Sequence, residues 1–151
     1  MLRKAFTDGL KEALKARDTR TVSAIRLILA QLKDRDIAAR PEGNAEGIAD
    51  AEIQRMLQSM VKQRRESIAL YEQGNRSDLV EREQSEIAVI ESFLPQQMSA
   101  DEIEAAARTA IAETGAAGLK DMGKVMTILR ERYAGMLDMS RVGPLVKGLL
   151  R

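Results

Sequence analysis

Hydrophobic residues recur every three or four positions along most of the chain, and no segment alternates hydrophobic and polar residues as a half-buried β-strand would. Good helix formers, namely Ala, Leu, Glu, Lys, Arg and Gln, dominate these periodic segments. The pattern therefore predicts an all-α fold. Helices are expected at about residues 2–16, 19–39, 50–73, 78–94, 99–115, 121–135 and 142–150.

The character of the sequence changes after Pro95. Ser99 and Glu102 are spaced three residues apart, which is the pattern of a capping box, and they open an Ala-rich segment. We therefore predict an N-terminal four-helix domain at residues 1–95 and a small three-helix tail domain at residues 96–151.

Three finer predictions concern single helices. Apolar residues spaced four apart from Leu2 to Leu14 are expected to form the buried face of the first helix. Asp78 and Glu81 resemble a second capping box, which would open the fourth helix. Pro144 is expected near the start of the last helix or else to bend it, because a proline inside a helix removes a backbone hydrogen bond.

The composition excludes several classes of chemistry. The chain of 151 residues contains no Cys and no His, its net charge is +1, and only 3% of its residues are aromatic. Disulfides, thiolate ligands, most zinc sites and catalysis by Cys or His are therefore absent. We expect no cofactor, no metal and no catalytic centre.

The sequence also bears on location. No apolar run approaches the roughly 20 residues that a membrane-spanning helix needs. The N-terminal residues lack the apolar core of a secretory signal. These two features predict a cytoplasmic protein without a membrane partner.

Several charged residues lie where apolar residues are expected. Arg64 falls in the middle of the apolar stripe of the helix at 50–73, Glu83 and Glu86 fall inside the stripe of the next helix, and Arg26 lies at the edge of another. One interpretation is a buried site that holds a small charged ligand. The other is a set of structural ion pairs, which we favour because Arg is the residue best suited to buried bidentate pairs.

The tail carries an excess of positive charge. Residues 119–151 contain seven Lys or Arg against three Asp or Glu, which gives a local charge of +4. An anionic partner would bind there. Six residues are candidate RNA contacts: Lys120, Lys124, Arg130, Arg132, Arg141 and Lys147.

Two runs of residues resemble the YqeY-like family. They are residues 62–67, Lys-Gln-Arg-Arg-Glu-Ser, and residues 120–126, Lys-Asp-Met-Gly-Lys-Val-Met. Supporting matches are Tyr71, residues 74–76, Leu79, Glu83, residues 86–87 and residues 94–95. The resemblance implies an all-α fold in two parts. It also implies a tail shared with the GatB subunit of the glutamine-dependent aminoacyl-tRNA amidotransferase, where this module contacts tRNA.

Three functional hypotheses follow. The first is a tRNA-associated accessory protein without a catalytic centre of its own, linked by its family to glutamine-dependent tRNA amidotransfer. The second is a helical protein-interaction module that binds amidotransferase or aminoacyl-tRNA synthetase subunits without RNA contact. The third is an enzyme of the glutamine-dependent carbon–nitrogen ligase class, which the resemblance implies as a label although no catalytic residues are visible.

Overall fold

The computed structural model describes residues 1–151, apart from the side chain of Ser140. Its described residues form α-helices and two short 3-10 helices and contain no strand, which confirms the predicted all-α fold. In chain order the α-helices are α1 (Leu2–Lys15), α2 (Thr19–Ala39), α3 (Asp50–Gln73), α4 (Ser77–Glu91), α5 (Ala100–Thr114), α6 (Met122–Arg132) and α7 (Met139–Leu149). The 3-10 helices are η1 (Arg40–Glu42) and η2 (Leu119–Asp121).

The chain folds as two compact units, Met1–Pro95 and Gln96–Arg151. The division falls at Pro95, the residue at which the sequence changes character. The first unit contains α1 to α4 and the second contains α5 to α7.

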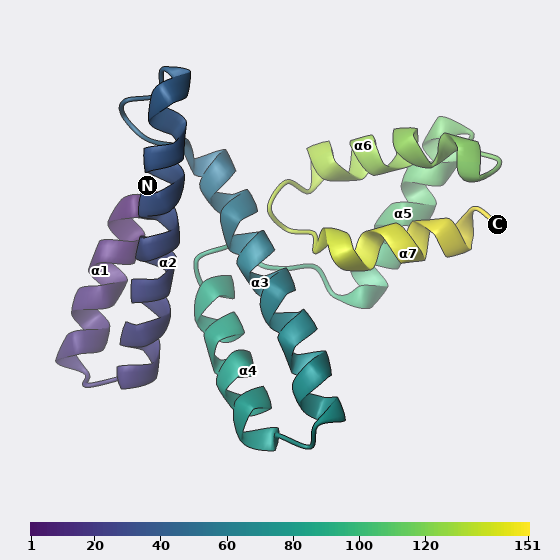
Figure 1. Cartoon of the computed structure of the whole chain (residues 1–151). Coiled ribbons are helices and arrows are strands. Elements are labelled where there is room, and N and C mark those ends of the chain that lie inside the picture. The colour runs from purple at the N-terminus through teal and green to yellow at the C-terminus, as the bar shows by residue number, and fades with distance from the viewer. The chain divides into compact units, whose positions relative to one another are not determined.

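The first unit consists of two helical hairpins, α1–α2 and α3–α4 (Figure 1). Helix α2 packs against α1 and also against α3 and α4, so it joins the two hairpins. The buried side chains of this unit form one hydrophobic cluster, whose removal from water stabilises the fold. Its fully buried members include Phe6, Ile25, Ile28, Ile53, Met56, Leu57 and Ile90.

The predicted buried face of α1 is wrong at its last position. Leu14 is 49% exposed, and Ala13 is buried in its place. A step of four residues advances by about 40° around a helix, so three such steps turn Leu14 about 120° away from Leu2. A step of seven from Phe6 reaches Ala13 with a drift of only about 20°.

The two predicted capping boxes have different outcomes. At α5 the Ser99 side chain accepts the Glu102 N–H, and the Glu102 side chain accepts the Ser99 N–H, as predicted. At α4 the box is wrong, because the carboxylate of Asp78 instead accepts two hydrogen bonds from Arg76, at 3.2 and 3.1 Å. Because α4 begins at Ser77, Asp78 lies inside its first turn and not at the N-cap position that a capping box requires.

The second unit has a separate core formed by α5, α6 and α7, and α6 and α7 run antiparallel to each other (Figure 1). Its most deeply buried residues are Ile103, Ala107, Ala110, Val125, Leu129, Leu137, Val142 and Val146. Pro144 lies inside α7 and not in its first turn, so the first of the two alternatives for this proline is wrong.

A polar junction fastens the loop before α3 to both helices of the first hairpin. Arg3 donates to both carboxylate oxygens of Asp36, at 2.8 and 2.9 Å, and also to the carbonyl of Ile48 at 2.9 Å. The Ile48 N–H donates to Asp36 Oδ1 at 2.9 Å. The hydrogen bonds from Arg3, together with the one from Ile48, lower the pKa of Asp36 from 3.8 to about 2.

Gly47 allows this junction to close, and its replacement by Ala tests how much the junction contributes. A Cβ atom at residue 47 would lie 2.6 Å from Arg3 Nη2 and 2.7 Å from Asp36 Oδ1. We expect Gly47→Ala to lower the free energy of unfolding by about 2–4 kcal/mol, through backbone strain and loss of the ion pair. Urea denaturation measures the change.

Gly43→Ala is the matched control. Gly43 and Gly47 have similar positive φ angles, +90° and +98°, but a Cβ at residue 43 meets nothing within 4 Å. Its replacement should therefore cost only the backbone strain, about 1 kcal/mol. Equal losses in the two variants would show that the junction adds nothing to stability.

Candidate functional site

The inward-facing charge of α3 lies against α4. Arg64 Nε donates to Glu86 Oε2 at 2.9 Å, and Arg64 Nη1 donates to the Met60 carbonyl at 3.1 Å. The Arg64 and Glu86 side chains are 15% and 14% exposed. A carboxylate this far from solvent needs a partner, and Arg64 supplies it.

Glu83 lies one turn before Glu86 and is also partly buried. Burial raises the pKa of Glu83 above its usual value of 4.5, and the nearby charge of Glu86 raises it further. Arg64 and Arg82 act in the opposite direction without cancelling the shift. The guanidinium of Arg64 therefore forms a hydrogen bond with Glu86, whereas at Glu83 its charge only reduces the rise in pKa.

Arg26 does not belong to this network. Its side chain is exposed, and it makes no ion pair within the part of the chain that the structure describes. Ile25 and Ile28 form the buried face of α2, and Arg26 is turned about 100° from Ile25. The two arginines and two carboxylates considered from the sequence thus do not converge on a ligand.

A second ion pair joins the same two helices. Arg65 Nη2 donates to Glu91 Oε1 at 3.1 Å, and both side chains are partly exposed. Lys62 lies on the exposed side of α3. The two arginines of the 62–67 run therefore both contact carboxylates of α4.

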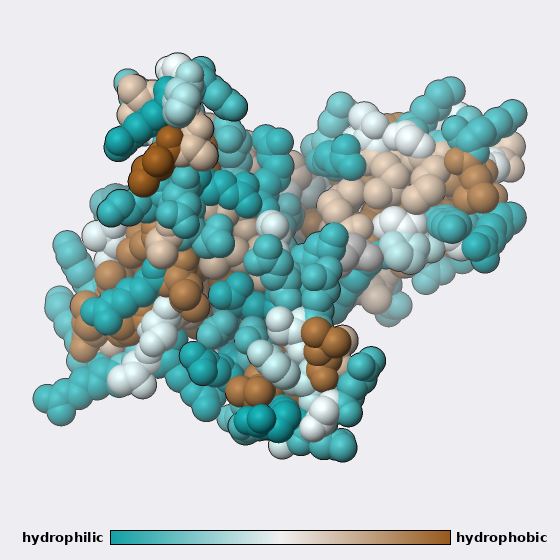
Figure 2. Space-filling model, viewed as in Figure 1, coloured by the Kyte–Doolittle hydropathy of each residue, from teal (hydrophilic) through white to brown (hydrophobic). Residues whose placement is uncertain are grey.

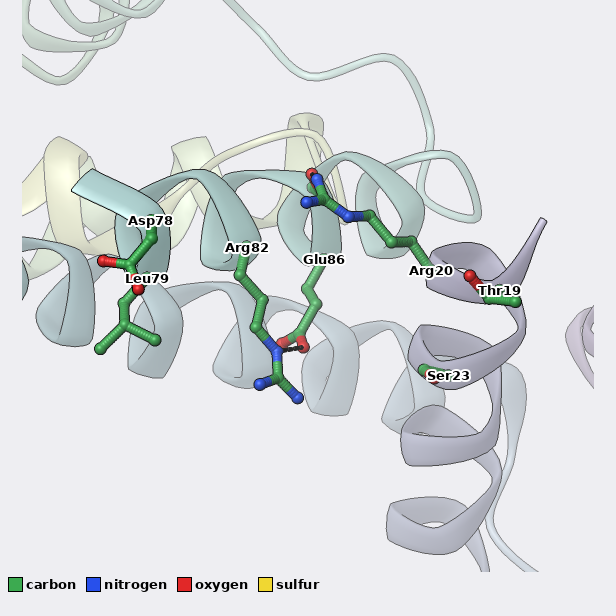
Figure 3. Close-up of a pocket in the computed structure, with 8 residues that line it drawn as sticks. Thr19, Arg20, Ser23, Asp78, Leu79, Arg82 and Glu86 are labelled. Carbon is green, nitrogen blue, oxygen red and sulfur yellow. Dashed lines mark hydrogen bonds and ion pairs between the residues drawn. The ribbon is translucent and has the colours of Figure 1, made fainter. Parts of the chain in front are cut away.

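Glu86 also borders a cleft between α4 and the first turn of α2 (Figure 3). Arg20 and Arg82 line this cleft, and sequence reasoning missed both of them. The spacing of four residues between Arg82 and Glu86 is a local signal that would have indicated their pairing. No local signal points to Arg20, because its hydrogen-bond partner, Ser85, is 65 residues away in the chain.

The six basic candidates of the second unit are all exposed, and two of them are engaged within the unit. Arg132 donates to Glu113 of α5, and this hydrogen bond raises the pKa of Arg132. Arg141 Nε lies 3.8 Å from Asp138 Oδ2. Among the described residues the other four make no ion pair: Lys120, Lys124, Arg130 and Lys147.

The antiparallel arrangement of α6 and α7 sorts these cations into two groups (Figure 1). Lys124 at the start of α6 and Lys147 near the end of α7 belong to one end of the hairpin. Arg130 and Arg141 belong to the other end. The structure thus distributes the positive charge along the hairpin and does not gather it at one point.

The described residues contain neither a metal-binding cluster of side chains nor a membrane-spanning helix. No group of three or more Asp, Glu, His or Cys side chains is arranged to hold a metal ion. No described helix is both long enough and apolar enough to cross a membrane.

The sequence matches the family described as Yqey-like protein over residues 3–150. It is also similar to curated proteins named "Altered inheritance of mitochondria protein 41, mitochondrial". The protein from Lachancea thermotolerans is 35% identical over 95 residues, which cover 63% of this chain and 49% of the relative. The protein from Eremothecium gossypii is 32% identical over 111 residues, covering 69% of this chain and 58% of the relative. The chain spans about half the length of the curated relatives it matches.

The predicted cytoplasmic location is contradicted by this comparison, because these relatives are named as mitochondrial proteins. The expectation rested on the missing apolar core of a secretory signal. Mitochondrial targeting segments are amphipathic and rich in Arg, so that absence bears on secretion alone.

The Arg64–Glu86 pair can be tested by replacing one partner alone and both partners together. Arg64→Ala leaves a partly buried carboxylate without its nearest partner, and we expect a loss of about 2–3 kcal/mol, below that of a fully buried pair. Arg64→Met combined with Glu86→Gln should lose less. Urea denaturation measures each variant, and Lys62→Ala on the same helix should change stability by less than about 0.5 kcal/mol. A loss no larger in Arg64→Ala than in Lys62→Ala would contradict a structural role for the pair.

Glu83→Gln tests the raised pKa of Glu83 through its effect on stability. Because the folded state binds this proton more tightly than the unfolded state, the folded wild-type protein is disfavoured as pH rises through the raised pKa. The variant should therefore have a higher Tm than the wild type at neutral pH. The difference should disappear below about pH 4, where the wild-type carboxyl is protonated in both states. Thermal unfolding at several pH values measures this, with Glu66→Gln as an exposed control on α3.

Proposed function

The chain belongs to the YqeY-like protein family, and we propose that it is a tRNA-associated accessory protein whose second unit contacts RNA phosphates. The proposal assigns the contacts to the six basic residues of that unit. They are Lys120, Lys124, Arg130, Arg132, Arg141 and Lys147.

The observation that carries the proposal is the set of exposed cations of the second unit that have no ion-pair partner among the described residues, such as Lys124 and Lys147. A cation without a partner binds phosphate without first breaking a salt bridge. Each such contact releases counterions from the nucleic acid, which is the main source of affinity in sequence-independent binding.

The aromatic content of the second unit indicates how it would contact RNA. Its one aromatic residue is Tyr133, which is partly buried and packs against the hydrophobic core. Base stacking needs an exposed aromatic face. The contacts proposed here are therefore to the RNA backbone, and recognition depends on the shape of the RNA.

The link to glutamine-dependent amidotransfer belongs to the same proposal. It rests on the resemblance of the second unit to the tail of GatB, in which the module contacts tRNA. We assign no catalytic step to this chain, because its sequence provides neither a Cys nucleophile nor a His base. The accessory role would be to hold tRNA near an enzyme that acts on it.

A protein-interaction module remains the rival, and one observation favours it. Leu70, near the end of α3, is 67% exposed, which is unusual for a large apolar side chain. Figure 2 shows hydrophilic residues over much of the visible surface, together with hydrophobic areas on the first hairpin and on the second unit. We prefer the RNA proposal because the second unit carries exposed cations, such as Lys124 and Lys147, that have no ion-pair partner among the described residues.

Titration of labelled tRNA at several salt concentrations tests the RNA proposal. The logarithm of the association constant should fall linearly with the logarithm of the salt concentration. Lys124→Ala combined with Lys147→Ala should reduce the slope by about 2, since each phosphate contact contributes about 1. Arg108→Ala is the matched control, because Arg108 is exposed on α5 in the same unit but is paired with Glu104.

Absence of tRNA binding at low salt would refute the proposal. The double variant removes two positive charges and Arg108→Ala removes one. A reduction of the slope in Arg108→Ala of half or more of that in the double variant would therefore also refute the proposal, because it would show that only net charge matters. A pull-down with amidotransferase and aminoacyl-tRNA synthetase subunits after RNase treatment would identify the rival function.

A further inference from the structure

A polar cleft lies between the first turn of α2 and the middle of α4, within the first unit (Figure 3). Its volume is about 400 Å³, which lies in the range of small-molecule sites. The residues that line it and carry the argument are Thr19, Arg20 and Ser23 of α2 and Arg82, Ser85 and Glu86 of α4.

The cleft exists because the contact between these two helices changes character along its length. Ile25 of α2 and Val89 of α4 belong to the hydrophobic cluster. One turn or more earlier on each helix, the facing positions are polar and leave a space that side chains do not fill. Residues 78, 82, 85 and 86 share one face of α4, since they are spaced by three or four.

The two carboxylates that line the cleft are already neutralised. Glu86 accepts from Arg64 at 2.9 Å, and Asp78 accepts twice from Arg76. Both carboxylates therefore have a cationic partner outside the lining of the cleft. Their repulsion of an incoming anion is correspondingly weakened.

The two arginines of the cleft are held much more loosely. Arg20 Nη1 lies 3.5 Å from Glu81 Oε1, and Arg82 Nε lies 3.7 Å from Glu86 Oε1. Their side chains are 60% and 69% exposed. Exposed pairs at these distances contribute little to stability, so both guanidinium groups can turn to a ligand at small cost.

Hydroxyl groups complete the lining. Arg20 Nη1 donates to Ser85 Oγ at 3.1 Å, which holds the guanidinium across the cleft from its own helix. Thr19 and Ser23 line the cleft from α2. The backbone N–H groups of α2 add little, because Asp18 already caps Thr21 there.

We infer that this cleft binds a small molecule carrying a phosphate group, held by Arg20 and Arg82 with a hydrogen bond from Ser23. Ser85 already donates to the Glu81 carbonyl and positions Arg20. Planar guanidinium groups bind phosphate oxygens in pairs, and hydroxyls donate to those that remain. A single phosphate fills only part of the volume, so the rest accommodates an organic group of about the size of a sugar. Leu79 provides the one apolar wall for it.

The experiment is a calorimetric and NMR titration of the full chain with ribose 5-phosphate, inorganic phosphate and unphosphorylated ribose. Ribose 5-phosphate should bind with a Kd of about 1 mM or lower, inorganic phosphate more weakly, and ribose not measurably. Arg20→Gln and Arg82→Gln should each weaken binding about tenfold. Both side chains are exposed, so neither variant should unfold the unit, and circular dichroism checks this.

Arg26→Gln is the control, since Arg26 is exposed on α2, carries the same charge and does not line the cleft. It should leave the affinity unchanged within about twofold. Equal loss in Arg26→Gln would overturn the inference, because binding would then follow net charge. Absence of ribose 5-phosphate binding would also overturn it, whereas tRNA binding by the second unit would be unaffected.

Discussion

The ion pair between Arg64 and Glu86 determines how α3 and α4 pack in the first unit. Two charged side chains, each about 85% removed from solvent, are tolerated there only because they satisfy each other. The pair fixes the rotation of α4 against α3, because Glu86 must point toward Arg64. With α4 held in that rotation, the face that carries Arg82 and Ser85 is turned toward α2 and lines the cleft.

The charged residues of the protein thus fall into two classes. Those of the first kind are engaged within the fold, as in the contacts of Arg64, Arg65 and Arg3 with carboxylates. They position helices and loops and have no capacity left for a partner of similar strength. Those of the second kind are exposed and weakly engaged, such as Lys124 of the second unit and Arg82 of the cleft. Anion binding is expected from the second class, because free guanidinium and ammonium groups do not lose an existing bond when they bind.

The chain contains neither Cys nor His, so the two proposed sites depend on arginine, lysine and hydroxyl groups. The two proposed sites use the same kind of attraction but lie in different units. The second unit offers dispersed cations to an extended polyanion, whereas the cleft is lined by two exposed arginines that we propose bind one small anion.

Features that depend on neighbouring residues in the chain were accessible from the sequence, whereas features that depend on which helices meet were not. Helical periodicity and the Ser99 capping box follow from interactions within a few residues, and they predicted the helices and the start of α5. Arg64 and Glu86 were identified for the same reason, since each interrupts an apolar stripe. The contacts of Arg3 with Asp36 and of Arg20 with Ser85 join residues 33 and 65 positions apart. Such contacts exist only after the helices have packed, because no local pattern specifies which polar side chains will then face each other.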